Sequence, residues 1–151
     1  MFVISKIIKG HELKVSVLGL GYIGLPTAAV LASRQIEVVG VDVNQYAVET
    51  INKGKIHIVE PDLDILVRAA VQTGHLRATM QVEKANAFVV AVPTPFKSNR
   101  SPDLSFIKSA AKSIAPVLEK GNMVILESTS PVGATEKMMG WMQELRSDLT
   151  F

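Results

Sequence analysis

The chain has 151 residues, about the size of one domain, and its 48% hydrophobic and 20% charged residues are typical of a globular protein and argue against disorder. Its net charge of +2 predicts no strong attraction to nucleic acid or to a membrane surface, and no apolar stretch approaches the length of a membrane span. The absence of cysteine excludes disulfides, thiolate metal sites and a cysteine nucleophile, and it is consistent with a cytoplasmic protein.

Strand and helix patterns alternate along the chain from residue 14 onward. Short apolar runs predict strands at residues 14–18, 37–41, 76–79, 87–92 and 123–126. Apolar residues on one helical face, with glycines that stop the helices, predict helices at residues 22–33, 44–53, 62–73, 103–118 and 134–145. Asp62 and Asp103 are the predicted N-caps of two of these helices.

This alternation predicts an α/β fold, namely a Rossmann-type doubly wound parallel sheet with helices on both faces. The predicted strands are almost continuous apolar runs, as expected for strands that are buried on both sides. Residues 1–13 fit no element and have no cleavage site of the kind that ends a signal peptide, so they are interpreted as an extension of unclear role.

A glycine motif, Gly19-Leu-Gly21-Tyr-Ile-Gly24, joins the first predicted strand to the first predicted helix. The pattern is weak evidence alone, but here it follows a strand, opens a helix and precedes an acidic residue at the end of the next strand. Gly19 permits a tight turn, Gly21 lets a pyrophosphate approach the backbone, and Gly24 allows close packing of helix on strand. The amides around Tyr22 and Ile23 should then face the phosphates at the positive end of the helix. A glycine-rich turn without a ligand is the alternative.

The acidic residue is Asp42, at the end of the second predicted strand. Its carboxylate should accept hydrogen bonds from the 2′- and 3′-hydroxyls of an adenosine ribose and would repel a 2′-phosphate. The next residues, Val43 and Asn44, offer no arginine to such a phosphate, so the predicted cofactor is NAD rather than NADP. A role of Asp42 as the cap of the following helix is compatible with this assignment. Residues 14–151 are therefore predicted to form an NAD-binding Rossmann domain.

Two hydroxyl-bearing segments follow the fourth and fifth predicted strands. Thr94 lies in a Pro-Thr-Pro turn, and the segment 127–135 supplies hydroxyls and free amides before the last helix. Ligands of open parallel sheets bind at these strand ends, so both segments are candidate contacts to the cofactor or a substrate. On pattern alone, a stiff turn and a capped helix start are equally consistent with them.

Other chemistry is not indicated by the sequence. The three histidines, His11, His57 and His75, have no metal-ligand spacing, so no metal site is predicted. His57 lies in an irregular loop and is interpreted as a solvated residue, with a contact to substrate as the alternative. No arrangement of nucleophile and base and no pair of carboxylates suggests hydrolysis.

Five ordered motifs together resemble those of the UDP-glucose/GDP-mannose dehydrogenase family: Gly19–Thr27, Val41–Asn44, Ile58–Pro61, Ala91–Phe96 and Leu126–Gly133. The similarity runs from about Val15 to Phe151 and is far more specific than the glycine motif alone. The resemblance implies that NAD is contacted by Tyr22, Ile23, Asp42, Thr94 and Thr135. It also implies that Thr129 lies near the reaction centre and helps to hold a catalytic water.

Enzymes of this family oxidise the C6 alcohol of a UDP-sugar to a carboxylate with two molecules of NAD. The motifs are most similar to the branch that acts on UDP-N-acetyl-D-mannosamine in bacterial surface-polysaccharide synthesis of the enterobacterial common antigen type, which implies this substrate and a homodimeric full-length protein. The catalytic cysteine and lysine of the family lie downstream of the matching segment. The resemblance therefore implies that this chain is the amino-terminal part of a longer enzyme and that this part alone is inactive.

Two other interpretations stay open. The chain is also consistent with the cofactor domain of a different UDP-sugar dehydrogenase or of a hydroxyacid dehydrogenase, although the motifs after the fourth and fifth strands argue against the latter. A free-standing nucleotide-binding module without chemistry is the third possibility.

Overall fold

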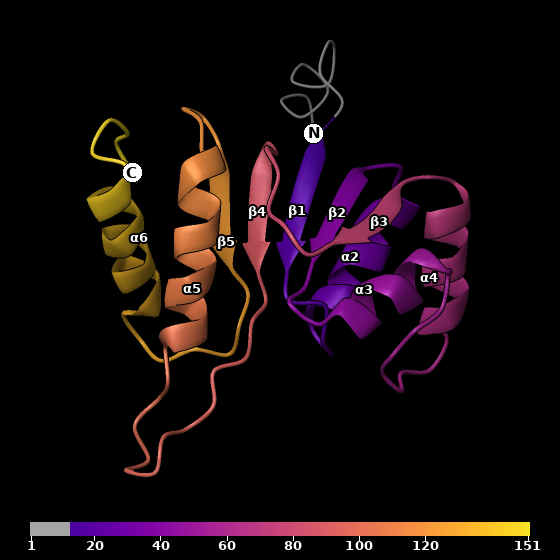
Figure 1. Ribbon diagram of the computed structural model, residues 1–151, viewed down its shortest axis with the longest axis horizontal. Coiled ribbons are helices and arrows are strands. Elements are labelled where there is room, and N and C mark those ends of the chain that lie inside the picture. Colours follow the sequence, from indigo (N-terminus) through magenta and orange to yellow (C-terminus); the bar gives the residue numbers. More distant parts are fainter. Residues whose placement is uncertain (1–12) are drawn as a thin grey trace, which may run out of the picture.

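The computed structural model describes residues 13–151, so the interpretation of residues 1–12 as part of an extension lies outside the described residues (Figure 1). The strands are β1 (Lys14–Leu18), β2 (Glu37–Val41), β3 (Leu76–Thr79), β4 (Ala87–Val90) and β5 (Met123–Leu126). The helices are α2 (Gly24–Ser33), α3 (Gln45–Asn52), α4 (Leu63–Gln72), α5 (Ser105–Ile114), the short 3-10 helix η1 (Ala115–Val117) and α6 (Ala134–Leu145). No helix in this described part is long and apolar enough to cross a bilayer.

The strands form one parallel sheet in the order β3-β2-β1-β4-β5. The chain starts in the middle of the sheet at β1, builds outward to β3, and then returns to place β4 on the other side of β1. This topology confirms the predicted doubly wound α/β fold. The change of direction between β1 and β4 creates the point at which open α/β sheets bind their ligands, beyond the carboxyl ends of the strands.

Two apolar clusters hold the helices against opposite faces of the sheet, because successive strand residues point to opposite sides. Val17 and Val38 contribute to the first cluster, with residues of α2, α3 and α4. Leu18 and Val39 contribute to the second, with residues of α5 and α6. In Figure 1 the two helix groups accordingly lie over different halves of the sheet, with α5 and α6 beside β5 and the others beside β2 and β3.

The edge strand β5 is not buried on both sides, contrary to the prediction for the strands. Val124 and Leu126 pack against the second cluster, whereas Met123 and Ile125 are 60% and 43% exposed. Helices α2, α3 and α4 pack over β1, β2 and β3, which leaves this face of β5 open to solvent.

The opposite edge of the sheet is closed by a side chain. Asn52, the last residue of α3, accepts a hydrogen bond from the Ala78 N–H at 2.8 Å and donates one to the Ala78 carbonyl at 2.9 Å. Its amide group therefore takes the place that a further strand beside β3 would occupy.

Both predicted aspartate caps differ in the structure. Asp62 precedes α4, but its backbone is left-handed with φ of 61° and its side chain makes no capping hydrogen bond, so this prediction was wrong. Asp103 accepts a hydrogen bond from the Ser105 N–H at 2.9 Å. Because α5 begins at Ser105 and Leu104 is the cap position, Asp103 supports the helix from one residue further upstream than predicted.

Candidate functional site

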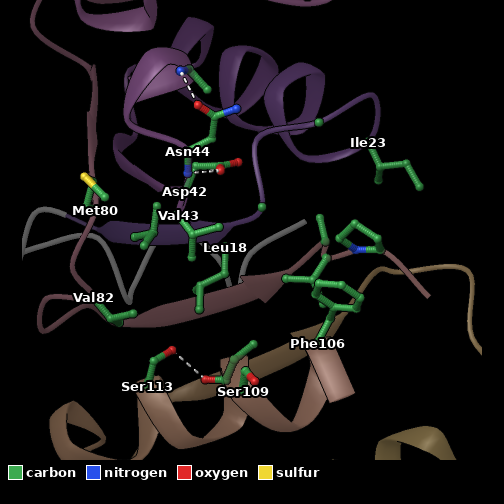
Figure 2. Close-up of a pocket in the computed structure, with 18 of the residues that line it drawn as sticks. Leu18, Ile23, Asp42, Val43, Asn44, Met80, Val82, Phe106, Ser109 and Ser113 are labelled. Carbon is green, nitrogen blue, oxygen red and sulfur yellow. Dashed lines mark hydrogen bonds between the residues drawn. The ribbon is translucent and has the colours of Figure 1, made fainter. Parts of the chain in front are cut away.

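A cleft of about 860 Å³ lies at the carboxyl ends of the strands, across the change of direction between β1 and β4 (Figure 2). Its wall comes from the turn after β1, the ends of β2 and β3, the loop after α3, the segment after β4 and part of α5. The cleft is therefore where the topology of the sheet predicts a ligand site.

The glycine motif forms the turn between β1 and α2, and its three glycines differ in their surroundings. Gly19 has φ of +88°, and a Cβ there would lie 2.6 Å from the Ala91 carbonyl oxygen. A Cβ at Gly24 would lie only 1.8 Å from the Gly19 carbonyl oxygen. A Cβ at Gly21 would meet no protein atom within 4 Å. Gly19 and Gly24 are thus required by the fold, whereas the space over Gly21 is open to the cleft.

Helix α2 begins at Gly24, two residues later than predicted, and this leaves amides of the turn free. Leu25 donates to the Gly21 carbonyl at 3.1 Å, and Thr27 donates to the Ile23 carbonyl at 3.2 Å. Within the described residues, the N–H groups of Gly21, Tyr22 and Ile23 donate to no protein acceptor. Unpaired amides at the positive end of a helix are suited to an anion such as a phosphate.

Asp42 is fixed at the end of β2 by two backbone amides. One carboxylate oxygen accepts from the Leu20 N–H and the other from the Asn44 N–H, both at 2.8 Å. Each oxygen keeps a second lone pair for a further donor. Helix α3 is capped by Asn44, whose side chain accepts hydrogen bonds from the amides of Tyr46 and Ala47. The capping role that the sequence allowed for Asp42 is therefore not needed. Figure 2 shows Asp42 and Asn44 together on the α3 side of the cleft.

The segments after β4 and β5 are tied to each other. The Thr94 hydroxyl donates to the Thr129 carbonyl, and the buried Ser128 hydroxyl donates to the Val92 carbonyl at 2.7 Å. Thr94 and Thr129 both line the cleft. Thr135 is exposed in the first turn of α6 and does not line it. Ser128 belongs to the segment 127–135 that was predicted to supply hydroxyls, but its pattern does not reveal that this hydroxyl is buried between two strand ends.

An apolar slot at the other end of the cleft was missed by the sequence reasoning. Val43, Met80 and Val82 lie on one side, and Ser109 and Ser113, one turn apart on α5, lie on the other (Figure 2). The Ser113 hydroxyl donates to the Ala110 carbonyl at 2.8 Å and keeps its lone pairs for a further donor. An apolar slot bordered by hydroxyls suits a flat heteroaromatic ring with polar edges. The position of Met80 and Val82 just after a predicted strand was the available signal.

His57 is not the solvated loop residue that the sequence suggested. It lines the cleft, and its Nδ1 atom is buried without a hydrogen-bond partner. Of the described residues that line the cleft, none is Lys or Arg, and Asp42 is the one acid. Positive potential for an anion therefore comes from backbone amides. No group of His, Asp and Glu among residues 13–151 could hold a metal ion.

The described geometry agrees with comparisons to known proteins. The sequence matches the UDP-glucose/GDP-mannose dehydrogenase family, NAD binding domain, over residues 13–151. An NDP-N-acetyl-D-galactosaminuronic acid dehydrogenase from Ralstonia nicotianae is 67% identical, over 91% of this chain and 32% of its own. A UDP-N-acetyl-D-mannosamine dehydrogenase from Yersinia pestis is 65% identical, over 91% and 33%.

A solved structure has the same fold. The UDP-D-ManNAc dehydrogenase from Pyrococcus horikoshii superposes with a TM-score of 0.86 at 39% identity, over 89% of this chain and 33% of its own. The chain thus spans about a third of the length of the curated relatives it matches. The family match confirms the predicted cofactor, NAD. With this match over almost all of its length, the chain belongs to the UDP-glucose/GDP-mannose dehydrogenase family and corresponds to its NAD-binding domain.

Proposed function

We propose that this domain holds NAD in the cleft as the cofactor-binding part of a dehydrogenase that oxidises the C6 alcohol of a UDP-sugar to a carboxylate. The observation that supports this best is the open space over Gly21 beside three unpaired amides at the start of α2. A dinucleotide pyrophosphate fits such a cradle, because it brings phosphate oxygens to amides that otherwise have no acceptor.

The other residues of the cleft have complementary roles in this proposal. Asp42, already oriented by two amides, accepts hydrogen bonds from the adenosine ribose. The slot formed by Val43, Met80 and Val82 takes the adenine ring. Thr94 and Thr129, at the opposite end, face the nicotinamide ribose and the substrate. Thr135 lies outside the cleft wall, and its role as a contact is supported by the family resemblance alone.

NAD, when bound, accepts a hydride from the carbon that is oxidised. The residues of this chain bind and orient the cofactor, and the apolar wall keeps water from the adenine end. The bonds of Thr94 and Ser128 fix the strand ends that approach the reactive end, so the cleft keeps its shape when the cofactor enters.

The identity of the sugar is also a proposal, because the chain spans only about a third of the length of its relatives. We propose UDP-N-acetyl-D-mannosamine, for which the Yersinia pestis relative is named. The Ralstonia relative, named for N-acetyl-D-galactosaminuronic acid, supports a nucleotide of N-acetyl-D-galactosamine, which differs from the mannosamine at C2 and C4, as the second candidate. A homodimeric full-length enzyme and a cytoplasmic location complete the proposal, and the absence of cysteine is consistent with a reducing compartment. The domain alone should bind NAD without oxidising a sugar nucleotide.

Calorimetric titration of the purified chain with NAD and with NADP tests the cofactor role. We expect NAD to bind at least about tenfold more tightly than NADP, because Asp42 repels a 2′-phosphate. Asp42→Asn, which removes the charge and also one of the two hydrogen bonds accepted from backbone amides, should narrow this difference. Absence of heat with NAD, or equal affinity for both, would contradict the proposal.

A further inference from the structure

One buried side-chain atom in the cleft wall has no hydrogen-bond partner among the described residues. Two buried side-chain atoms among the described residues make no hydrogen bond, Ser16 Oγ and His57 Nδ1. Ser16 lies within β1 and does not line the cleft, whereas His57 does. Buried polar atoms in folded proteins are nearly always paired, and His57 Nδ1 is the one of these two buried side-chain atoms that belongs to the cleft wall.

The buried atom bears on where the ring proton lies. A neutral imidazole has one nitrogen that donates and one that accepts. Among buried backbone groups, an N–H without an acceptor is rarer than a carbonyl without a donor. By analogy, a neutral His57 ring with its proton on Nε2 leaves only an acceptor at the buried Nδ1 position and makes Nε2 the donor.

The loop that carries His57 is anchored on the apolar cluster to which α2 and α4 contribute. Ile56 and Ile58, on either side of it, pack against the apolar cluster that contains Leu25 of α2 and Leu63 of α4. Helix α4 also packs directly on α2. The loop 53–62 is thus anchored through its isoleucines, and the histidine between them turns to the wall that it shares with the glycine motif.

The charge of the cleft makes a donor at this place useful. A dinucleotide pyrophosphate carries two negative charges, yet none of the described residues that line the cleft is Lys or Arg. The amides of the turn after β1 supply hydrogen bonds to one side of the phosphates. A side-chain donor on the loop 53–62 would add a hydrogen bond from a second segment of the cleft wall.

We propose that His57 is a further cofactor-binding residue, whose Nε2–H donates a hydrogen bond to a phosphate oxygen of the dinucleotide at the start of α2. The inference rests on the proposed function, because it requires NAD in this cleft. It goes beyond that function by assigning a role to a side chain that the glycine motif and Asp42 do not include.

Two substitutions of the same residue separate hydrogen bonding from packing. In His57→Gln the side-chain amide N–H lies near the position of Nε2, and in His57→Asn it lies near that of Nδ1. Calorimetry with NAD should give a dissociation constant for His57→Gln within about threefold of the unsubstituted chain. His57→Asn should bind at least about tenfold more weakly, the usual loss for a hydrogen bond to a charged group. Thermal unfolding without NAD checks that both variants fold.

The outcomes distinguish the inference from the proposed function. If the unsubstituted chain binds NAD and both variants bind it equally well, His57 is not a phosphate ligand and the proposed function stands. Equal weakening of both variants would indicate packing and would also overturn the inference. If the unsubstituted chain does not bind NAD, the proposed function itself fails.

A spectroscopic measurement gives an independent readout. Two-bond ¹H–¹⁵N correlation spectra of the labelled chain report which ring nitrogen carries the proton, with the His57 signals assigned by their loss in His57→Gln. We expect the Nε2–H form without ligand, and a shift of the Nε2 signals on addition of NAD. A proton on Nδ1, or Nε2 signals that do not change at saturating NAD, would overturn the inference.

Discussion

Replacement of Gly21 by alanine tests the cofactor cradle with little effect on the fold. Gly21 is not among the glycines with positive φ, and its added Cβ would meet no protein atom within 4 Å. A Gly→Ala change at such a site normally raises the free energy of unfolding by roughly 0.4–1 kcal/mol. The methyl group would, however, occupy the space that the pyrophosphate needs. Loss of one hydrogen bond to a charged phosphate is worth about 1.5–3 kcal/mol, which corresponds to roughly 10- to 150-fold in the dissociation constant for NAD.

Gly24→Ala is the matched control, because its methyl group would lie 1.8 Å from the Gly19 carbonyl oxygen. We expect this variant to lose about 3 kcal/mol or more of stability, since backbone atoms rather than a flexible side chain must move. Urea unfolding measures the stability of both variants, and calorimetry measures NAD binding by Gly21→Ala. Unchanged affinity of Gly21→Ala would refute the assignment of the open space to the pyrophosphate, and a large loss of its stability would show that Gly21 is a structural glycine.

Three further predictions concern stability. Asn52→Ala removes both bonds to the buried backbone of Ala78 and should lower the free energy of unfolding in urea by about 1–3 kcal/mol, whereas a smaller loss would show that water replaces the amide. Ser16→Ala deletes a buried hydroxyl without a partner and should raise this free energy by up to about 1 kcal/mol; a decrease would mean that the hydroxyl is paired in solution. The hydrogen bond from Arg77 lowers the pKa of Glu83 from 4.5 to about 2. The contribution of the ionised Glu83 carboxylate to the free energy of unfolding is therefore complete above pH 4.5 and is lost as the pH falls towards 2. Between pH 4.5 and 2, Glu83→Gln should lose less of its free energy of unfolding than the unsubstituted chain. We expect a difference of up to about 1 kcal/mol, because the Arg77–Glu83 ion pair is exposed. An equal loss in both proteins would contradict this prediction.

Four of the five strands begin and end where the sequence predicts, because each is a short apolar run between polar or glycine-rich segments. The exception is β4, which ends at Val90 although the apolar run continues to residue 92. Beyond Val90 the backbone leaves the ladder to form the cleft wall, where the Val92 carbonyl accepts from Ser128. Local pattern does not reveal where a strand loses its neighbour.

The predictions that differ from the structure concern features that depend on distant parts of the chain. The apolar run of β5 does not show that α2, α3 and α4 leave one of its faces bare, since this depends on how far they extend over the sheet. Asp62 is an ordinary cap residue in sequence, but its backbone is left-handed and its side chain makes no hydrogen bond to the helix amides. His57 lies in a loop without periodicity, and its position follows from the packing of its two isoleucine neighbours.

The candidate site was predictable where a motif acts through its own backbone. The glycine motif and Asp42 lie on consecutive elements at fixed spacing, so their meeting follows from the fold class. The slot for a flat ring draws on β2, β3 and α5, and no short sequence pattern links these three elements. Its recognition requires the assembled sheet.

The side-chain amide of Asn52 blocks one of the two edges of the sheet. A molecule that approaches β3 finds the Ala78 donor and acceptor already taken, so it cannot add a strand there without displacing that side chain. Among residues 13–151 no side chain closes the β5 edge in this way, and Met123 and Ile125 of this strand are exposed. A strand added to this sheet would therefore pair with β5 rather than with β3.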